Sequence, residues 1–248
     1  MGAARPGILF RGDGLVAVDK PAGLPSTGRD LDDPDCLQSW LGDQIGRMVW
    51  AVHQLDADTS GVLLFVERKG LVAEVARRLR HPGSRKVYLA ICHGVPAFDR
   101  STVDAPIGEV ASSPPPPTSG RATTSSSAPR SPRAQRLGVT PTGRAARSRI
   151  VVLDRAEDAA LLEVTIATGR THQIRIHLAH LGHPLVGEPI YRDPPSRIHL
   201  RHALHASTLV LGGSPRQVFH VPLPEDLVRL ARKLGLDPER AEPSSRTS

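Results

Sequence analysis

The sequence has 248 residues, enough for one large domain with its own core, and we expect a single domain. Lys and Arg total 32 against 25 Asp and Glu, a net charge of +7 that favours a polyanionic partner over an acidic small molecule. Cys36 and Cys92 form no CxxC motif, and neither a signal peptide nor a bilayer-length apolar run is present, so we expect a cytoplasmic protein with no disulfide framework and no membrane contact.

The N-terminal segment predicts two strands and a loop of fixed shape. Two β-forming runs, 8–12 and 15–19, flank a Gly-Asp-Gly turn. A loop with two restricting prolines follows from Lys20 to Thr27. Such a loop either connects two strands or holds a polar substrate against rigid main chain, and both interpretations stay open.

The segment HQLDADTSG, residues 53–61, precedes an apolar strand expected over residues 61–67. Turn chemistry explains most of its polar residues, because Asp, Ser, Thr and Gly suit tight connections. Asp56 differs because it follows Leu55 and should lie close to the core, where an ionised carboxylate is costly unless something pairs with it. A nearby guanidinium would keep such a carboxylate ionised and oriented, and therefore usable as a nucleophile.

A helix is predicted within residues 70–83, where apolar residues from Leu71 to Leu79 recur at helical spacing and Pro82-Gly83 ends the helix. Its other face carries three arginines, which indicate either a solvated surface or a contact with phosphate. The next segment, 86–94, alternates and is rich in β-formers, so we expect a strand with Tyr88 near its start.

Residues 111–136 have almost no apolar side chains and cannot bury a core, so we expect a disordered insertion there. Regular structure should return with two strands, over 148–155 and 161–166. The insertion is thus expected to interrupt the single domain.

A helix is predicted from about His172 to Leu181, with Thr171 as its capping residue. The buried stripe of this helix is expected to be Ile174, Leu178 and Leu181. His172 and Arg175 lie three residues apart and should share another face of the helix.

The C-terminal part predicts a strand over 204–211 and a short amphipathic helix over 225–234. We expect the domain to end there, covering residues 1–234, and residues 235–248 to form a polar, disordered tail.

Eleven histidines raise the alternative of a metal-dependent hydrolase. The spacing is unfavourable, because no acidic residue lies between the candidate ligands in the manner of HExxH, and we expect no metal and no cofactor. A nucleophile elbow, a phosphate-binding P-loop and a GxGxxG turn are also absent from the sequence.

Several motifs together resemble the signatures of one enzyme family. HQLD at 53–56, DTSG at 58–61, GRTHQIRIH at 169–177 and LHA at 204–206 match the RluA-type pseudouridine synthases in order and register. DKPAGL at 19–24 and KVY at 86–88 also match. The resemblance implies an α/β (α+β) fold, a pseudouridine-synthase-like catalytic domain with a central mixed, mainly antiparallel sheet flanked by helices.

The resemblance also implies roles for individual residues. Asp56 would be the catalytic aspartate, which either attacks the sugar as a nucleophile or acts first as a base. Arg175 would be its partner, and Tyr88 the aromatic that stacks on the target base and is a candidate to deprotonate it. The expected substrate-binding residues are His53, Gln54, Leu55, Thr59, Arg170, His172, Gln173 and Leu204. The implied reaction isomerises uridine in RNA without a cofactor, and the target base must first leave its stack.

The chain departs from the family pattern at two places. Gln54 stands where the family usually has an arginine that helps to fill the gap left by the flipped base. The segment 212–215 replaces the usual His-Pro after the last strand, which should alter a peripheral loop only.

The expected partner is RNA, a stem-loop of tRNA or rRNA, since aromatic residues at 3% make a stacking platform for long single strands improbable. We expect no N-terminal RNA-binding domain, no obligate protein partner and a monomer. The main alternative is a non-catalytic RNA-binding or RNA-chaperone protein on the same fold.

Overall fold

The structure, a computed structural model, describes residues 5–30, 33–110 and 136–242. The expected insertion at 111–136 therefore lies outside the described residues, apart from Arg136, which begins a strand.

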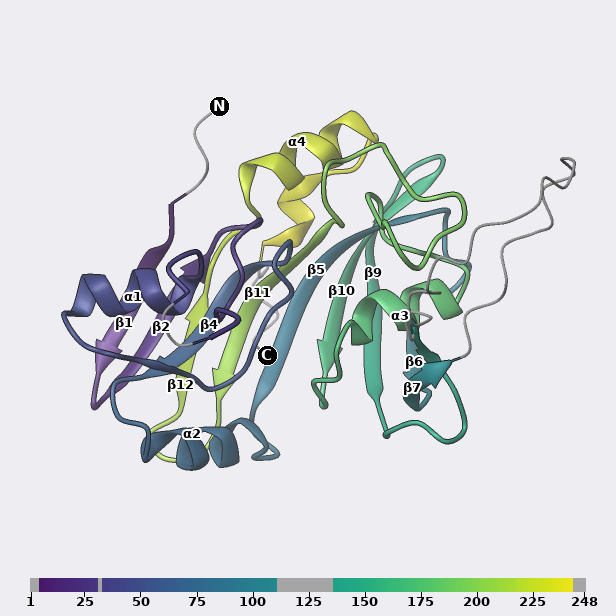
Figure 1. The fold of residues 1–248 in the computed structure, drawn as a ribbon. Helices are drawn as coiled ribbons and strands as arrows, with labels where there is room; N and C mark the ends of the chain where they lie inside the picture. The colour runs from purple at the N-terminus through teal and green to yellow at the C-terminus, as the bar shows by residue number, and fades with distance from the viewer. Residues whose placement is uncertain (1–4, 31–32, 111–135, 243–248) are drawn as a thin grey trace, which may run out of the picture.

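A ten-stranded mixed sheet forms the centre of the described fold (Figure 1). Its order is β1-β2-β4-β11-β5-β10-β9-β6, with β12 paired to β11 and β3 paired to β4. β4 and β11 run parallel, whereas the other pairs of this sheet among the described residues are antiparallel. The predicted mixed, mainly antiparallel sheet is confirmed.

The strands of this sheet are β1 (Gly7–Gly12), β2 (Leu15–Lys20), β3 (Trp50–Ala51), β4 (Ser60–Val66), β5 (Arg85–His93), β6 (Arg100–Asp104), β9 (Arg147–Arg155), β10 (Ala159–Ile166), β11 (Leu204–Leu211) and β12 (Gln217–His220). A separate hairpin joins β7 (Ile107–Val110) and β8 (Arg136–Val139).

Four α-helices of the described chain lie around the sheet: α1 (Leu37–Ile45), α2 (Leu71–Leu79), α3 (Gln173–His180) and α4 (Glu225–Lys233). The sequence predicted α2, α3 and α4, whereas α1 was not predicted. In Figure 1, α4 lies at the top, α2 at the bottom and α3 in front of β10 and β9.

The two faces of the sheet bury different sets of side chains, because successive residues of a strand point to opposite faces. On β5, Tyr88 and Ala90 pack in the cluster that includes residues of α1 and α3. Leu89 and Ile91 of the same strand pack with α4. The face that packs against α1 and α3 carries the residues of the candidate site.

The start of α3 differs from the expectation. Thr171 is exposed, and His172 occupies the N-cap position with φ 56° and no side-chain capping bond. Gln173 closes the turn instead, because its side-chain Oε1 accepts a hydrogen bond from the Arg170 N–H at 3.1 Å. The helix therefore begins one residue later than predicted.

The expectation of a disordered tail from residue 235 is wrong for residues 235–242. Leu236 is 3% exposed and packs in the cluster under α4. A 3₁₀-helix, Pro238–Ala241, follows and is capped by Asp237. The segment is polar on average, so its composition does not indicate that Leu236 anchors it to the core.

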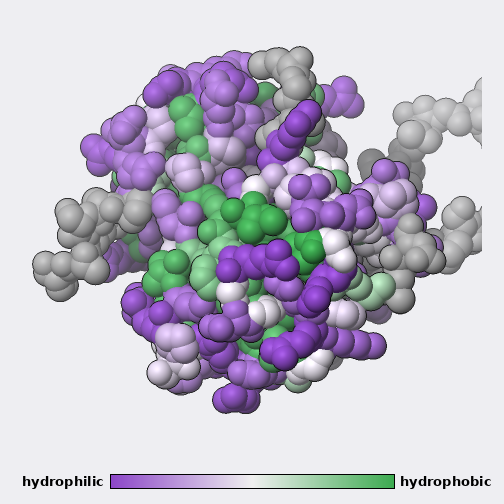
Figure 2. Space-filling view, turned by 90° about the vertical axis from the view of Figure 1, so that its left-hand side faces the viewer, coloured by the Kyte–Doolittle hydropathy of each residue, from purple (hydrophilic) through white to green (hydrophobic). Residues whose placement is uncertain are grey.

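Among the described residues, no helix is long and apolar enough to cross a bilayer. Figure 2 looks at the side where α1 and β1 lie and shows an apolar patch within a largely polar surface. β1 is an edge strand of the sheet, and its Ile8 and Leu9 are exposed.

Candidate active site

One cavity of about 550 Å³ is lined by every residue that the sequence predicted for the site. These residues are His53, Gln54, Leu55, Asp56, Thr59, Tyr88, Arg170, His172, Gln173, Arg175 and Leu204. They come from three regions far apart in the sequence: the segment before β4, strand β5, and the region from α3 to β11.

Asp56 lies beside a buried arginine that also binds a second carboxylate. Arg175 Nη1 donates to Asp56 Oδ2 at 3.0 Å, and Arg175 Nε and Nη2 donate to the two oxygens of Glu188 at 2.9 and 2.8 Å. Glu188 is fully buried, whereas the Asp56 side chain is 24% exposed. Arg175 thus fixes the orientation of the Asp56 carboxylate at the cavity wall.

The opposite charges of Arg175 and its two carboxylate partners, Asp56 and Glu188, offset the free-energy cost of burying them. Burial alone would lower the pKa of Arg175, but Glu188 and Asp56 raise it above its ordinary value. Burial alone would likewise raise the pKa of Glu188, but hydrogen bonds and charge from Arg175 hold it below its ordinary value. The arginine and Glu188 are therefore both charged near neutral pH.

The backbone around Asp56 is fixed by side chains from other parts of the chain. Lys20, fully buried, donates from Nζ to the carbonyls of Pro21, Leu24 and Ala57 at 2.9, 2.6 and 2.6 Å. Burial lowers the pKa of Lys20 to about 7, and the charges of nearby aspartates oppose this.

Two further side chains hold the same backbone. Ser26 Oγ donates to the Leu55 carbonyl at 2.7 Å, and the Leu55 N–H donates back to Ser26 Oγ at 3.0 Å. Arg201, anchored on Asp226 of α4, donates from Nη1 to the carbonyl of Asp58 at 3.0 Å. The position of the Asp56 carboxylate therefore depends on a network of buried hydrogen bonds.

His172 approaches the same oxygen of Asp56 that Arg175 binds. Its Nε2 is 3.8 Å from Asp56 Oδ2, and its Nδ1 is 2.7 Å from the Tyr191 hydroxyl. Burial lowers the pKa of His172 despite the negative charge of Asp56, so the ring is neutral at pH 7. The backbone of His172 has φ 56°, in the left-handed region, where a non-glycine residue is strained. Such strain is common at functional sites.

Tyr88 and Leu204 form the apolar part of the cavity wall. They lie on the neighbouring strands β5 and β11 and are 7% and 4% exposed. Burial, and secondly the charge of Asp56, raise the pKa of Tyr88. The phenol therefore remains protonated, which favours stacking and hydrogen-bond donation over proton abstraction.

Some predicted substrate-binding residues have their polar atoms engaged inside the protein. Thr59 Oγ1 lies 2.8 Å from His202 Nε2. Gln173 is 3% exposed and bonds Thr168, Arg170, Arg147 and Ser148. Both line the cavity, but their side chains chiefly fix its walls.

The remaining polar lining residues, Gln54, Arg170 and His53, also contact other parts of the protein. Gln54 is exposed and donates from Nε2 to Thr27 Oγ1 at 3.0 Å, whereas Arg170 donates from Nε to the carbonyl of Ala145. His53 Nε2 accepts the N–H of Leu64 at 3.3 Å.

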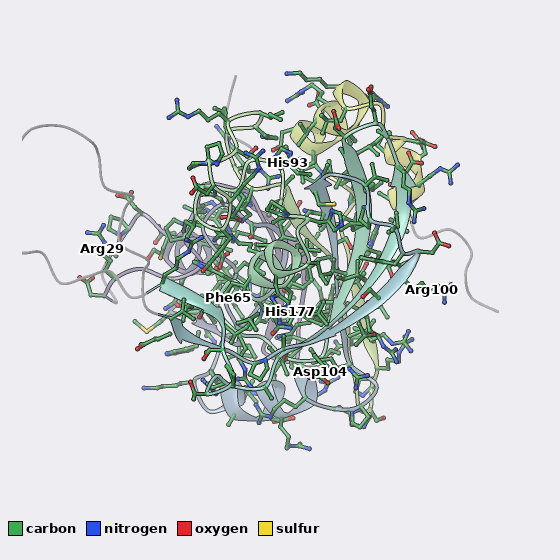
Figure 3. The ribbon with its side chains drawn as sticks, turned by 90° about the vertical axis from the view of Figure 1, so that its right-hand side faces the viewer. Arg29, Phe65, His93, Arg100, Asp104 and His177 are labelled. Atoms are coloured by element: carbon green, nitrogen blue, oxygen red, sulfur yellow. The ribbon has the colours of Figure 1, made fainter. Side chains whose placement is uncertain are left out.

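The clustered histidines of the sequence separate in space. His177 (Figure 3) is buried between Ser148 Oγ and the carbonyl of Ala105. His180, in contrast, is exposed. Within the described part of the chain, no group of three or more His, Cys, Asp or Glu side chains could hold a metal ion. The alternative of a histidine-based hydrolase has no support there.

Sequence reasoning missed Glu188, Lys20, Arg201 and Tyr191. Glu188 and Lys20 are fully buried, but no sequence pattern distinguishes Glu188 from a surface charge. Lys20 lies in the matching motif DKPAGL, yet the motif does not show that its side chain is buried. Tyr191 was detectable only as one of two tyrosines in the chain. Its ring lies 5.3 Å from the Arg175 guanidinium, so it orients both Arg175 and His172.

Residues 14–180 match the sequence profile of a family described as RNA pseudouridylate synthase. An uncharacterized RNA pseudouridine synthase of Chloroflexus aurantiacus is 40% identical over 189 residues, covering 74% of this chain and 52% of that protein. Ribosomal large subunit pseudouridine synthase D of Nitrosomonas europaea is 32% identical, covering 92% of this chain and 64% of that protein. The chain thus spans about half to two thirds of the length of these relatives.

A relative of similar length is tRNA pseudouridine synthase C of Vibrio cholerae, 31% identical over 93% of this chain and 91% of that protein. The solved structure of human RNA pseudouridylate synthase domain containing 4 has a TM-score of 0.70 at 24% identity, covering 93% of this chain and 94% of that chain. That structure shows the same fold.

Proposed function

The chain belongs to the RNA pseudouridylate synthase family, and we propose that it isomerises uridine to pseudouridine in a structured RNA. The observation that carries this proposal is the Asp56 carboxylate, which Arg175 binds and orients at the wall of a cavity that also presents Tyr88. A nucleophilic carboxylate beside a buried aromatic ring suits a reaction at a sugar carbon that bears a flat base.

The reaction requires no second substrate. Asp56 attacks C1′ of the flipped nucleotide, and the C1′–N1 bond breaks with its electron pair remaining on uracil. The ring turns within the cavity, its C5 attacks C1′, and the bond to Asp56 breaks. The proton on C5 is lost and a proton is gained at N1, so atoms and charges balance without a cofactor.

A single carboxylate can suffice for this chemistry. Glycosidases use a second carboxyl group to protonate the leaving oxygen, whereas uracil leaves as a stabilised anion. The cavity must also retain the detached base, and the buried Tyr88 and Leu204 supply an apolar wall for that purpose. Tyr88 stacks on the base in this proposal and stays protonated.

The proposed substrate is a stem-loop of tRNA or rRNA, because the names of similar proteins include both classes. We propose that the catalytic domain comprises residues 1–234 together with the packed segment 235–242, and that it acts as a monomer in the cytoplasm. Positive net charge supplies phosphate contacts, which offset the cost of moving a base out of its stack.

The test maps pseudouridine in total tRNA and rRNA by carbodiimide modification and reverse transcription. Cells without the gene are complemented with the wild type or with Asp56→Asn. Loss of specific sites, restored by the wild type alone, is the expected result and also identifies the substrate. Tritium release from [5-³H]uridine-labelled transcripts by purified protein separates an enzyme from a protein that only binds RNA, since a pure binder releases none.

A further inference from the structure

Lys86 is a cationic side chain on the cavity wall that the reaction outlined above does not use. It lies on β5, two residues before Tyr88 and on the same face of the strand, and it is partly buried. Among the described residues, no carboxylate lies within 4.0 Å of its Nζ, and this nitrogen has no hydrogen-bond acceptor. Each of the other cations in the cavity, Arg170 and Arg175, has a partner.

The surroundings of Lys86 offer no compensation for its charge. His53 is a neighbouring cavity residue, and burial, followed by the charge of Lys86, holds the pKa of His53 well below its ordinary value. On the other side, Lys86 Nζ lies close to Gly169, at 3.6 Å from the place where a β-carbon would be. Burial lowers the pKa of Lys86 itself. An uncompensated cation in a partly dry cavity is costly, so it indicates that a ligand supplies the missing acceptor.

The position of Lys86 limits what that acceptor is. Residues two apart on a strand are separated by about 7 Å, which is comparable to the length of a pyrimidine with its exocyclic oxygen. A base stacked on Tyr88, with its sugar beside Asp56, therefore extends along β5 toward Lys86. The neighbouring Ile166 makes this part of the cavity partly apolar, which suits a base edge better than a phosphate.

We propose that Lys86 donates a hydrogen bond to a carbonyl oxygen of the uracil ring and stabilises the negative charge that this ring acquires when the C1′–N1 bond breaks. The inference rests on the proposed pseudouridine synthase function and assigns one additional catalytic residue to it. When the C1′–N1 electron pair moves into the ring, it is delocalised onto the two carbonyl oxygens. A preorganised ammonium group interacts more strongly with one of these oxygens in the transition state than in the ground state, because the oxygen carries more negative charge there. Catalysis requires such a difference between the two states.

The test compares Lys86→Met and Lys86→Arg with the wild type in two measurements. The first is the single-turnover rate of pseudouridine formation at saturating enzyme, together with the RNA dissociation constant and its salt dependence. The second is an NMR titration with uracil and with barbiturate, a pyrimidine that is anionic at neutral pH. Lys69→Met, the same change at an exposed lysine, is the matched control.

Lys86→Met is expected to lower the single-turnover rate by about 10²-fold, as for removal of one donor to a developing anion, with RNA affinity within about threefold. Lys86→Arg should recover part of that rate. The wild type should prefer barbiturate to uracil, and Lys86→Met should lose this preference. Lys69→Met should resemble the wild type in both measurements.

Other outcomes overturn separate claims. An active wild type with an equally active Lys86→Met protein refutes the role of Lys86 and leaves the proposed function standing. A loss confined to RNA affinity, with a salt dependence reduced by about one phosphate contact, assigns Lys86 to the backbone instead and also refutes the inference. A wild type without activity on any RNA refutes the proposed function, whereas a barbiturate preference that depends on Lys86 would still support the anion site.

Discussion

Asp56 and Arg175 lie 119 residues apart in the sequence and meet through a hydrogen bond of 3.0 Å from Nη1 to Oδ2. The other side of the guanidinium is fully occupied by Glu188. Arg175 therefore cannot rotate away from Asp56 without breaking two buried charge-assisted bonds, and the carboxylate keeps one orientation toward the cavity.

Replacing Asp56 with Asn should abolish pseudouridine formation because an amide cannot act as the nucleophile. RNA affinity should stay within a few-fold, since one neutralised carboxylate does not weaken an interface dominated by phosphate contacts. Tritium release and filter binding measure the two effects. Asp43→Asn, on the exposed surface of α1, is the control and should retain activity. Substantial turnover by Asp56→Asn would contradict the assigned nucleophile.

Replacing Glu188 with Gln should destabilise the fold. Arg175 is 4% exposed, and removing one partner of a buried ion pair costs about 3–5 kcal/mol in the free energy of unfolding. Urea denaturation checks the value. Activity should also fall, because Arg175 loses the group that orients it toward Asp56. An unchanged unfolding midpoint would show that the pair contributes no net stability.

Arg175→Lys should impair activity even though it retains the positive charge. An ammonium group cannot make the bidentate contact with Glu188 and reach Asp56 together. The single-turnover rate measures the effect, with Arg77→Lys on the exposed face of α2 as the control. Equal rates for the two variants would mean that a point charge near Asp56 is enough.

Lys20→Met should lower both stability and activity. The change leaves three carbonyl oxygens without their donor, and each buried polar group left unsatisfied costs about 1–3 kcal/mol. One of these carbonyls belongs to Ala57, next to the proposed nucleophile. Thermal unfolding and single-turnover rates measure the two effects, and Lys69→Met serves as the control.

The free energy of unfolding should fall as the pH decreases from about 6.5 toward about 4. Burial lowers the pKa of His205 from 6.5 to about 4 in the folded protein. Protons then bind the unfolded chain more readily than the folded one across this window, so stability is present above the unfolded pKa and is lost on acidification. Denaturation of His205→Gln at several pH values should give a shallower slope than the wild type.

The exposed His180→Gln variant controls for this measurement and should keep the slope of the wild type. A His205→Gln slope equal to that of the wild type would assign the acid sensitivity to other groups. We compare the slopes of unfolding free energy against pH because removing a buried histidine that makes two hydrogen bonds also lowers stability at every pH.

The sequence by itself determined many of the elements and the identity of the residues around the cavity. Periodicity located the helices α2 and α4 and the strands β4, β5, β9, β10 and β11, because burial of one face imposes a regular spacing of apolar residues. The helix α1 and the strands β6, β7 and β8 were not predicted. The motif around Asp56 and the one around Arg175 were recognisable because each is local and lies next to a predicted element.

Only the tertiary structure decided how these motifs act together. A strand pattern does not encode which strands pair, so the parallel contact of β4 with β11, which brings Ser60 opposite His205, was not predictable. Nor does the sequence distinguish a buried charge from an exposed one, because burial depends on segments distant in the chain. Only the fold therefore identified the burial of Glu188, Lys20 and Lys86. The fold also showed the partners of Glu188 and Lys20, and showed that Lys86 has no partner among the described residues.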